Sequence, residues 1–252
     1  MAIPIRNAQE IEKLYLASQV VGKTLSYISG FIKPGISLLE IDKLAEEYIY
    51  ALGAKPAFKG LYGFPNTACI SVNQVIIHGI PTSYCLKDGD IVGIDIGANL
   101  DGWYGDGAIT FGVGEIAKQD KKLIDCARDS LMVAISSIKE GMYFKELSKI
   151  IEEVITSRGF VPLRDYCGHG IGRKPHDEPS ILNYVDSVNL KQGSKIRNGM
   201  VFCIEPMVCV SSGIPKILSD KWSVVSEDGL NGAHYEHTVA IVDGFARILT
   251  EV

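Results

Sequence analysis

The chain has 252 residues, of which 46% are apolar and 22% charged, and its formal net charge is −5. This balance is typical of a globular protein and excludes a disordered chain. The apolar runs end well before the roughly 20 residues that a membrane-spanning helix needs, and the first residues lack the regions of a signal peptide. We therefore expect a cytoplasmic protein without membrane contact, and the negative charge gives no reason to expect nucleic-acid binding.

The six cysteines show no CxxC spacing, and most lie in apolar segments such as VFCIEPMVCV. A disulfide framework or a zinc ribbon would need regular cysteine spacing. Free, buried thiols are therefore the expectation.

Two helices are predicted in the first part of the chain. Asn7 followed by Glu10 is a capping-box pattern, and apolar residues at helical spacing continue to Gly30. Ser37 and Glu40 repeat the capping pattern before a second amphipathic helix.

A similar segment recurs 106 positions further along the chain. Adding 106 lays Gly53 onto Gly159 and Pro56 onto Pro162, and eight other residues of the segment also fall on identical ones. Matches at the helix-ending glycines as well as within the helix favour a duplication. We predict one catalytic domain over residues 1–252, made of two related halves, roughly 1–113 and 114–252.

Five strand-like runs are rich in Val, Ile and aromatic residues and are interrupted by Gly and Asp. They are Ala68–Ile77, Asp90–Ala98, Trp103–Val113, Met200–Val210 and Tyr235–Val242. The expected architecture is an α+β fold in which helices cover one face of a mainly antiparallel sheet.

Asp95 and Asp106 lie in two of these runs, which are joined by a turn at residues 99–102. If the turn is symmetric, Asp95 lies directly opposite Asp106, whereas a register shifted by two makes them diagonal neighbours on one face. Apolar neighbours such as Ile94 and Ile96 favour burial over a solvated acidic face. Two buried carboxylates repel each other unless they share a proton or bind a cation, so the pair predicts a metal site.

Three histidines stand in segments suited to a site. His169 lies between Gly168 and Gly170, which let the backbone approach a ligand closely, although a glycine-rich turn with one structural histidine is the alternative. His176 follows in the same segment. His78 should emerge at the end of a strand, where sites are often built, while a structural role is its alternative.

Two glutamates lie in apolar runs where an ionised carboxylate needs a partner, Glu205 in VFCIEPMVCV and Glu236 in AHYEHTVAIV. Each alone could belong to a salt bridge. Together with the two aspartates they supply four carboxylates, whose charge two divalent cations would balance. No HExxH helix, GxSxG elbow or P-loop offers another chemistry.

The ordered motifs HGIP, IDIG, WYGD, CGHGIG, IEPM and YEHT resemble those of the type I bacterial methionine aminopeptidases. The resemblance extends over about residues 11–250. It implies the pita-bread fold, with two pseudo-symmetric halves and the metals between them. The implied activity is removal of the initiator methionine from nascent polypeptides, with a small second residue preferred.

The resemblance also implies roles for single residues, each at a position that matches the family's motif. Two divalent cations, of Co, Mn, Fe or Zn, would be held by Asp95, Asp106, His169, Glu205 and Glu236. Glu205 would also move a proton, His176 would stabilise the oxyanion, and His78 would hold the peptide beside the scissile bond. The implied partners are nascent N-termini, with the ribosome as a further candidate, and the implied state is a monomer.

An apolar slot for the methionine side chain is a separate expectation, for which the alternative is ordinary core packing. Its predicted lining residues are Phe58, Leu61, Phe64 and Trp222. Pro175 departs from the family, in which many bacterial members carry an aromatic residue at this position. The shape of the slot therefore does not follow from the resemblance.

Two other interpretations stay open. Pita-bread peptidases that cut X-Pro bonds share the five ligand types, but they usually carry an additional N-terminal domain, whereas the first helix here begins near residue 7. A non-catalytic relative would keep the fold, but such proteins generally lose ligands that this chain retains.

Overall fold

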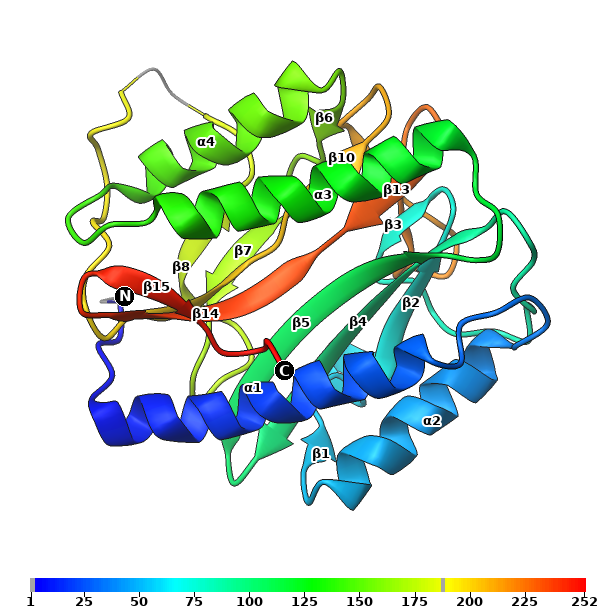
Figure 1. The fold of residues 1–252 in the computed structure, drawn as a ribbon, viewed down its shortest axis with the longest axis horizontal. Helices are drawn as coiled ribbons and strands as arrows, with labels where there is room; N and C mark the ends of the chain where they lie inside the picture. Colours follow the sequence, from blue (N-terminus) through cyan, green and yellow to red (C-terminus); the bar gives the residue numbers. More distant parts are fainter. Residues whose placement is uncertain (1–2, 187–188) are drawn as a thin grey trace.

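The computed structural model describes residues 3–186 and 189–252. These residues form an α+β structure with four α-helices, as expected (Figure 1). The helices are α1 (Ala8–Ser29), α2 (Leu38–Ala51), α3 (Lys118–Ser137) and α4 (Phe144–Ser157), and a short 3-10 helix, η1, spans Leu61–Gly63. In the described ranges, no helix combines the length and the apolar character needed to cross a membrane.

The first two helices begin where the capping patterns predict. Asn7 accepts a hydrogen bond from the backbone N–H of Glu10 at 3.0 Å, and the Glu10 carboxylate accepts one from the N–H of Asn7 at 3.0 Å. At α2, Ser37 accepts from the N–H of Glu40 at 3.2 Å. These side chains satisfy backbone donors that the first turn of a helix leaves free. Helix α1 ends at Gly30, as predicted.

A nine-stranded antiparallel sheet forms the centre of the described structure. Its order is β1-β4-β5-β14-β9-β7-β8, with β2 also paired to β4 and β15 to β14. The strands are β1 (Lys55–Pro56), β2 (Ala68–Val72), β4 (Ile91–Leu100), β5 (Trp103–Gly112), β7 (Cys167–Gly170), β8 (Asp177–Leu182), β9 (Val201–Ile204), β14 (Glu236–Val242) and β15 (Phe245–Ile248).

Two smaller antiparallel sheets have the orders β13-β10-β6 and β11-β12-β3. Their strands are β3 (Val75–Ile77), β6 (Val161–Pro162), β10 (Met207–Cys209), β11 (Pro215–Ile217), β12 (Val224–Ser226) and β13 (Gly232–His234).

Two of the predicted strands are each divided in the structure. The run Ala68–Ile77 is interrupted at Asn73, whose φ of +55° is a turn conformation, so that β2 and β3 join different sheets. The run Met200–Val210 is interrupted at Glu205 and Pro206, because proline lacks the N–H that a sheet ladder requires. This second break leaves Glu205 just beyond the end of β9.

The hairpin of β4 and β5 has a tighter turn than the symmetric one considered from the sequence. Asp101 and Gly102 form a two-residue turn with φ of +52° and +77°, which is the type I′ pattern. Asp95 consequently pairs with Ala108, and Asp106 lies two positions further along β5. Direct opposition of the two aspartates is therefore wrong. They are diagonal neighbours on the same face of the sheet.

The helices form two pairs. In the view of Figure 1, α3 and α4 lie above the strands β14 and β5, and α1 and α2 lie below them. One apolar core joins α1 and α2 to β2 and β4, and a second joins α3 and α4 to β9 and β14. Helix α1 crosses β5 closely at Gly105, where an added Cβ would lie 2.6 Å from the backbone of Ser18. All six cysteines are free, as expected, but Cys85 is exposed and Cys167 is only partly buried, so the expectation of burial is wrong for these two.

Candidate metal centre

A cavity of about 380 Å³ contains every site residue predicted from the sequence. These are Phe58, Leu61, Phe64, His78, Asp95, Asp106, His169, His176, Glu205, Trp222 and Glu236. The remaining lining residues, which were not named as candidates, are Tyr62, Cys69, Ile77, Asp165, Tyr166 and Cys167. Acidic and imidazole groups thus share one cavity with an aromatic wall.

Three of the four carboxylates come from adjacent strands of the main sheet. Ala108 of β5 pairs with Asp95 of β4 on one side and with Glu236 of β14 on the other. Residues in one such row project from the same face of a sheet. Asp106, two positions from Ala108, projects from that face as well. Hydrogen-bond register alone therefore gathers three acidic side chains that would repel one another.

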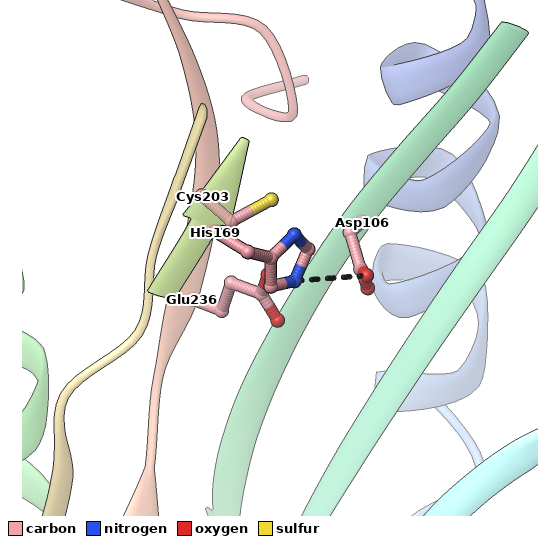
Figure 2. A group of neighbouring side chains, drawn as sticks. All are labelled: Asp106, His169, Cys203 and Glu236. Atoms are coloured by element: carbon pink, nitrogen blue, oxygen red, sulfur yellow. Dashed lines mark ion pairs between the residues drawn. The ribbon is translucent and has the colours of Figure 1, made fainter. Parts of the chain in front are cut away.

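His169 and Glu205 complete the group from β7 and the end of β9. The Nε2 atom of His169 lies 3.5 Å from Oε1 of Glu205 and 3.8 Å from Oδ2 of Asp106. The dashed line in Figure 2 marks the contact between His169 and Asp106. The other ring nitrogen, Nδ1, lies 3.1 Å from the carbonyl oxygen of Gly170. This contact fixes the ring with Nε2 toward the carboxylates, which is the usual arrangement of a metal-binding histidine.

Glycines allow β7 to approach its neighbours. A Cβ at Gly168 would lie 2.3 Å from the carbonyl oxygen of Cys203 in β9, and one at Gly170 would meet the carbonyl of Glu178 in β8. The glycines around His169 therefore permit close strand packing, whereas the sequence suggested that they let the backbone approach a ligand.

The side chains form two overlapping groups with the spacing of a metal site. Asp106, His169, Cys203 and Glu236 each offer a ligand atom within 4.8 Å of the others (Figure 2). Glu236 also belongs to a second group with Glu205 and His234. Burial raises the pKa of the Cys203 thiol, and Sγ lies 3.4 Å from the hydroxyl of Thr238, so a neutral thiol is the expected form.

The protonation of the acidic groups is strongly shifted in the protein alone. Burial raises the pKa of Asp95 to about 6. Burial and the neighbouring carboxylates raise the pKa values of Asp106 and Glu236 well above their usual range, and burial together with Asp95 does so for Glu205. A cation would reverse these shifts, because it stabilises the ionised carboxylates.

Burial lowers the pKa of His169 to about 3, so its imidazole is neutral and available as a ligand at neutral pH.

Unpartnered atoms show that this group fits a divalent cation. Among the described residues, Oδ1 of Asp95 and Oε1 of Glu236 are buried without a hydrogen-bond partner. Buried polar atoms are normally paired, so two orphaned carboxylate oxygens facing one site call for a positive ligand. Oxygen and imidazole donors in one shell suit Mn, Fe, Co or Zn.

The two other predicted histidines border the same cavity. The ring of His176 lies edge-on to that of His169, with 4.5 Å between centroids. The exposed ring of Tyr62 is nearly parallel to the ring of His176, with 6.1 Å between centroids. His78 follows β3, as predicted, and has a φ of +58°, a strained conformation for a residue with a side chain. Burial lowers the pKa of His78 to about 4.

The predicted slot residues lie together at the apolar part of the cavity. Phe58, Phe64 and Cys69 form a buried cluster against which Leu61 and Trp222 pack. The rings of Phe64 and Trp222 meet edge-on at 5.1 Å. Pro175 is not among the residues that line the cavity.

The motif IDIG is part of the same wall. A Cβ at Gly97, the glycine of this motif, would lie 2.5 Å from Cε1 of Phe58, so the aromatic ring needs a glycine beneath it.

His234 is a notable residue that the sequence reasoning missed. Its Nε2 lies 3.6 Å from Oε2 of Glu205. The available signal was its position two residues before Glu236, because alternate residues of an extended segment share a face. Tyr62 and Tyr166 were missed because nothing in their spacing separates them from ordinary aromatic residues.

Comparison with known proteins places the chain in a family. The chain matches the model of metallopeptidase family M24 over residues 12–243. It is 58% identical to a methionine aminopeptidase of Helicobacter pylori over 100% of both chains. The crystal structure of methionine aminopeptidase from Thermotoga maritima superposes with a TM-score of 0.96 at 39% identity, over 100% of each chain. A prolidase from Pyrococcus furiosus gives a TM-score of 0.80 at 25% identity and covers 98% of this chain but 65% of the prolidase.

Fold and site together define a metallopeptidase, and the chain belongs to metallopeptidase family M24. Within this family it falls among the bacterial type I methionine aminopeptidases, which are metallo-exopeptidases. Its structure is the pita-bread fold of these enzymes and of prolidases, as the motifs predicted.

Proposed function

We propose that this chain removes the N-terminal methionine from nascent polypeptides, with two divalent cations held by Asp95, Asp106, His169, Glu205 and Glu236. One observation carries the proposal: the cavity that contains these five residues continues into an apolar aromatic wall. A metal centre can activate a water, and the wall can bind a methionine side chain beside it. The names of the relatives support the same substrate.

The cations, when bound, supply polarisation of the scissile carbonyl and a water of lowered pKa. The two aspartates and Glu236 bring the negative charge that holds them, and His169 adds a neutral nitrogen donor. Asp106 and Glu236 are the most deeply buried of the carboxylates and would help to hold the cations at the base of the cavity.

Glu205 and the two other histidines act on the substrate. Glu205 takes the proton of the attacking water and passes it to the leaving amine, for which its place at the cavity is suitable. His176 donates a hydrogen bond to the developing oxyanion, and His78 orients the peptide next to the scissile bond. The free α-amine of the substrate binds near Asp95, so a blocked N-terminus is not accepted.

The wall formed by Phe58, Leu61, Phe64 and Trp222 selects methionine, because an unbranched apolar side chain fits a narrow aromatic slot. We further propose a preference for a small second residue, action as a cytoplasmic monomer, and nascent chains as partners, with the ribosome as a further candidate. The single catalytic domain over residues 1–252 is part of the same proposal.

Peptide hydrolysis tests the proposal directly. The metal-loaded protein should release methionine from Met-Ala-Ser but not from N-acetyl-Met-Ala-Ser, and it should leave Ala-Pro-Ala intact. Cleavage of only Ala-Pro-Ala would show an X-Pro peptidase, the activity suggested by the fold of the prolidase. No cleavage of any peptide would favour a non-catalytic binding protein.

A further inference from the structure

His234 lies behind the proposed metal centre rather than in the cavity. Its side chain is 3% exposed, and it is not among the residues that line the cavity. It therefore has no access to a substrate in the cavity, and the groups beside it are the acidic residues Glu205 and Glu236. Within the described residues its Nε2 is buried without a hydrogen-bond partner, which is rare for a ring nitrogen in a protein interior.

Glu205 is the neighbour that this nitrogen faces. The carboxylate of Glu205 lies between two imidazoles, with Oε1 at 3.5 Å from Nε2 of His169 and Oε2 at 3.6 Å from Nε2 of His234. The 3.6 Å separation is longer than the roughly 2.7–3.2 Å of an N–H···O hydrogen bond, so a bond between these atoms requires a small movement of the carboxylate. His169 faces the cavity, while His234 approaches Glu205 from the protein interior.

The backbone of His234 is fixed by a single side chain of the main sheet. The hydroxyl of Thr110 in β5 accepts a hydrogen bond from the N–H of His234 at 2.9 Å and donates one to its carbonyl oxygen at 2.8 Å. Glu205 is held at its own backbone, where Asn183 donates to its carbonyl oxygen at 3.0 Å. The backbones of both residues are thus held by hydrogen bonds, which limits the positions of their side chains, as a positioning contact requires.

We propose that His234 is a positioning residue, whose Nε2–H donates a hydrogen bond to Oε2 of Glu205 and holds this carboxylate toward the metal and the attacking water. The inference rests on the proposed function and deepens it. Glu205 follows a strand break and is assigned two roles, as ligand and as proton carrier. A carboxylate with both roles needs a defined orientation, and partners of metal ligands commonly provide it.

Replacement by two amides of different reach tests this contact. The amide nitrogen of glutamine in His234→Gln can take the place of Nε2, whereas that of asparagine in His234→Asn is one carbon too short. With cobalt-loaded protein at saturating metal, we expect His234→Asn to lower kcat by about 10- to 100-fold with little change in KM, and to weaken Co²⁺ affinity in calorimetry by a similar factor. His234→Gln should stay within a few-fold of the wild type in both measurements.

His237 provides matched controls on the neighbouring strand. It is partly buried, whereas His234 is buried, and its Nδ1 contacts the hydroxyl of Thr250 at 2.8 Å rather than a carboxylate. His237→Gln and His237→Asn should leave Co²⁺ affinity and the visible absorption of bound Co²⁺ unchanged, whereas His234→Asn should change this absorption because the ligand shell includes Glu205.

Equal affinity and kcat in the two His234 variants and the wild type would overturn the proposal, and so would equal losses in both variants. Failure of the proposed function is distinguishable, since the wild type would then release no methionine from Met-Ala-Ser, whatever its affinity for Co²⁺.

Discussion

Single residues of this site combine charge and burial, which either a bound cation or retained protons can compensate. Asp95 carries a buried, unpartnered oxygen and lies on the same face as two other carboxylates. In a protein without a cation such groups keep their protons to a higher pH than in water. The metal centre is therefore expected to show itself in the pH dependence of folding stability as well as in activity.

The substitution Asp95→Asn isolates this effect in metal-stripped protein. Burial raises the pKa of Asp95 to about 6, whereas an aspartate in the unfolded chain titrates near 4. The folded state then binds the proton of Asp95 more tightly than the unfolded state does. The resulting contribution to the free energy of unfolding is fully present below about pH 4 and is lost as the pH rises through about 6. The advantage of Asp95→Asn over the wild type should grow over this range by on the order of 2 kcal/mol and then stay constant.

Urea unfolding between pH 4 and pH 8 with a chelator measures this difference. Addition of Mn²⁺ should remove the advantage of the variant, because the cation stabilises the ionised aspartate. Asp101→Asn, in the exposed turn of the same hairpin, is the control. An advantage of Asp95→Asn that does not vary with pH would contradict the assignment.

The aromatic wall makes a separate prediction. Trp222→Ala removes a ring that packs on Phe64 at the cavity, so a methionine side chain loses part of its apolar contact. We expect kcat/KM for Met-Ala-Ser to fall about 10-fold or more, mainly through KM, with metal affinity unchanged. Tyr50→Ala, at a residue that is 54% exposed on α2, serves as control. An unchanged KM, or a loss of bound metal, would show that Trp222 has another role.

At the scale of elements, the sequence is most informative where a local signal is strong. The capping pair of Asn7 and Glu10 fixed the beginning of α1, because both hydrogen bonds are made within one turn. The register of the β4–β5 hairpin was harder, since it depends on which two residues form the turn. The pair Asp101 and Gly102, a common type I′ sequence, was the decisive signal.

The breaks within two predicted strands differ in how clearly the sequence indicates them. Pro206 could have been recognised as the end of a strand, because it lacks a backbone donor. The turn at Asn73 gives only a weak signal in a run of apolar residues. The five proposed ligands were found from apolar context and motif order. His234 was missed, because its contact with Glu205 depends on the pairing of β13 with β10, which sets His234 opposite Met207.

Packing of α1 on the hairpin gives a prediction for Gly105. An alanine Cβ at this position would lie 2.6 Å from backbone atoms of Ser18, which cannot move aside without displacing the helix. We expect Gly105→Ala to lower the free energy of unfolding by about 1–3 kcal/mol or more. Gly93→Ala, in the paired strand β4, would meet its nearest atom at 3.4 Å and should cost little. Similar urea midpoints for the two variants would contradict this account of the packing.

For the whole molecule, the offset of 106 residues recurs in the structure as well as in the sequence. Helix α2 (Leu38–Ala51) and helix α4 (Phe144–Ser157) have bounds that differ by 106, and so do the bounds of β1 (Lys55–Pro56) and β6 (Val161–Pro162). Duplication of one α+β unit stays a prediction that this coincidence supports.

The proposed ligands divide between the two predicted halves. Asp95 and Asp106 come from the first half, while His169, Glu205 and Glu236 come from the second. The cavity is therefore formed by residues of both predicted halves. Neither half alone supplies both the imidazole and all the carboxylates.

The central claim is that this shared metal centre carries out the hydrolysis. The most direct measurement titrates metal-stripped protein with Mn²⁺ or Co²⁺ and follows methionine release from Met-Ala-Ser, beside the double variant Asp95→Ala, Asp106→Ala. The account predicts no release from stripped protein, recovery that is complete at two equivalents of metal, and no release by a double variant whose circular dichroism is unchanged. Full activity of the stripped protein or of the double variant would contradict it.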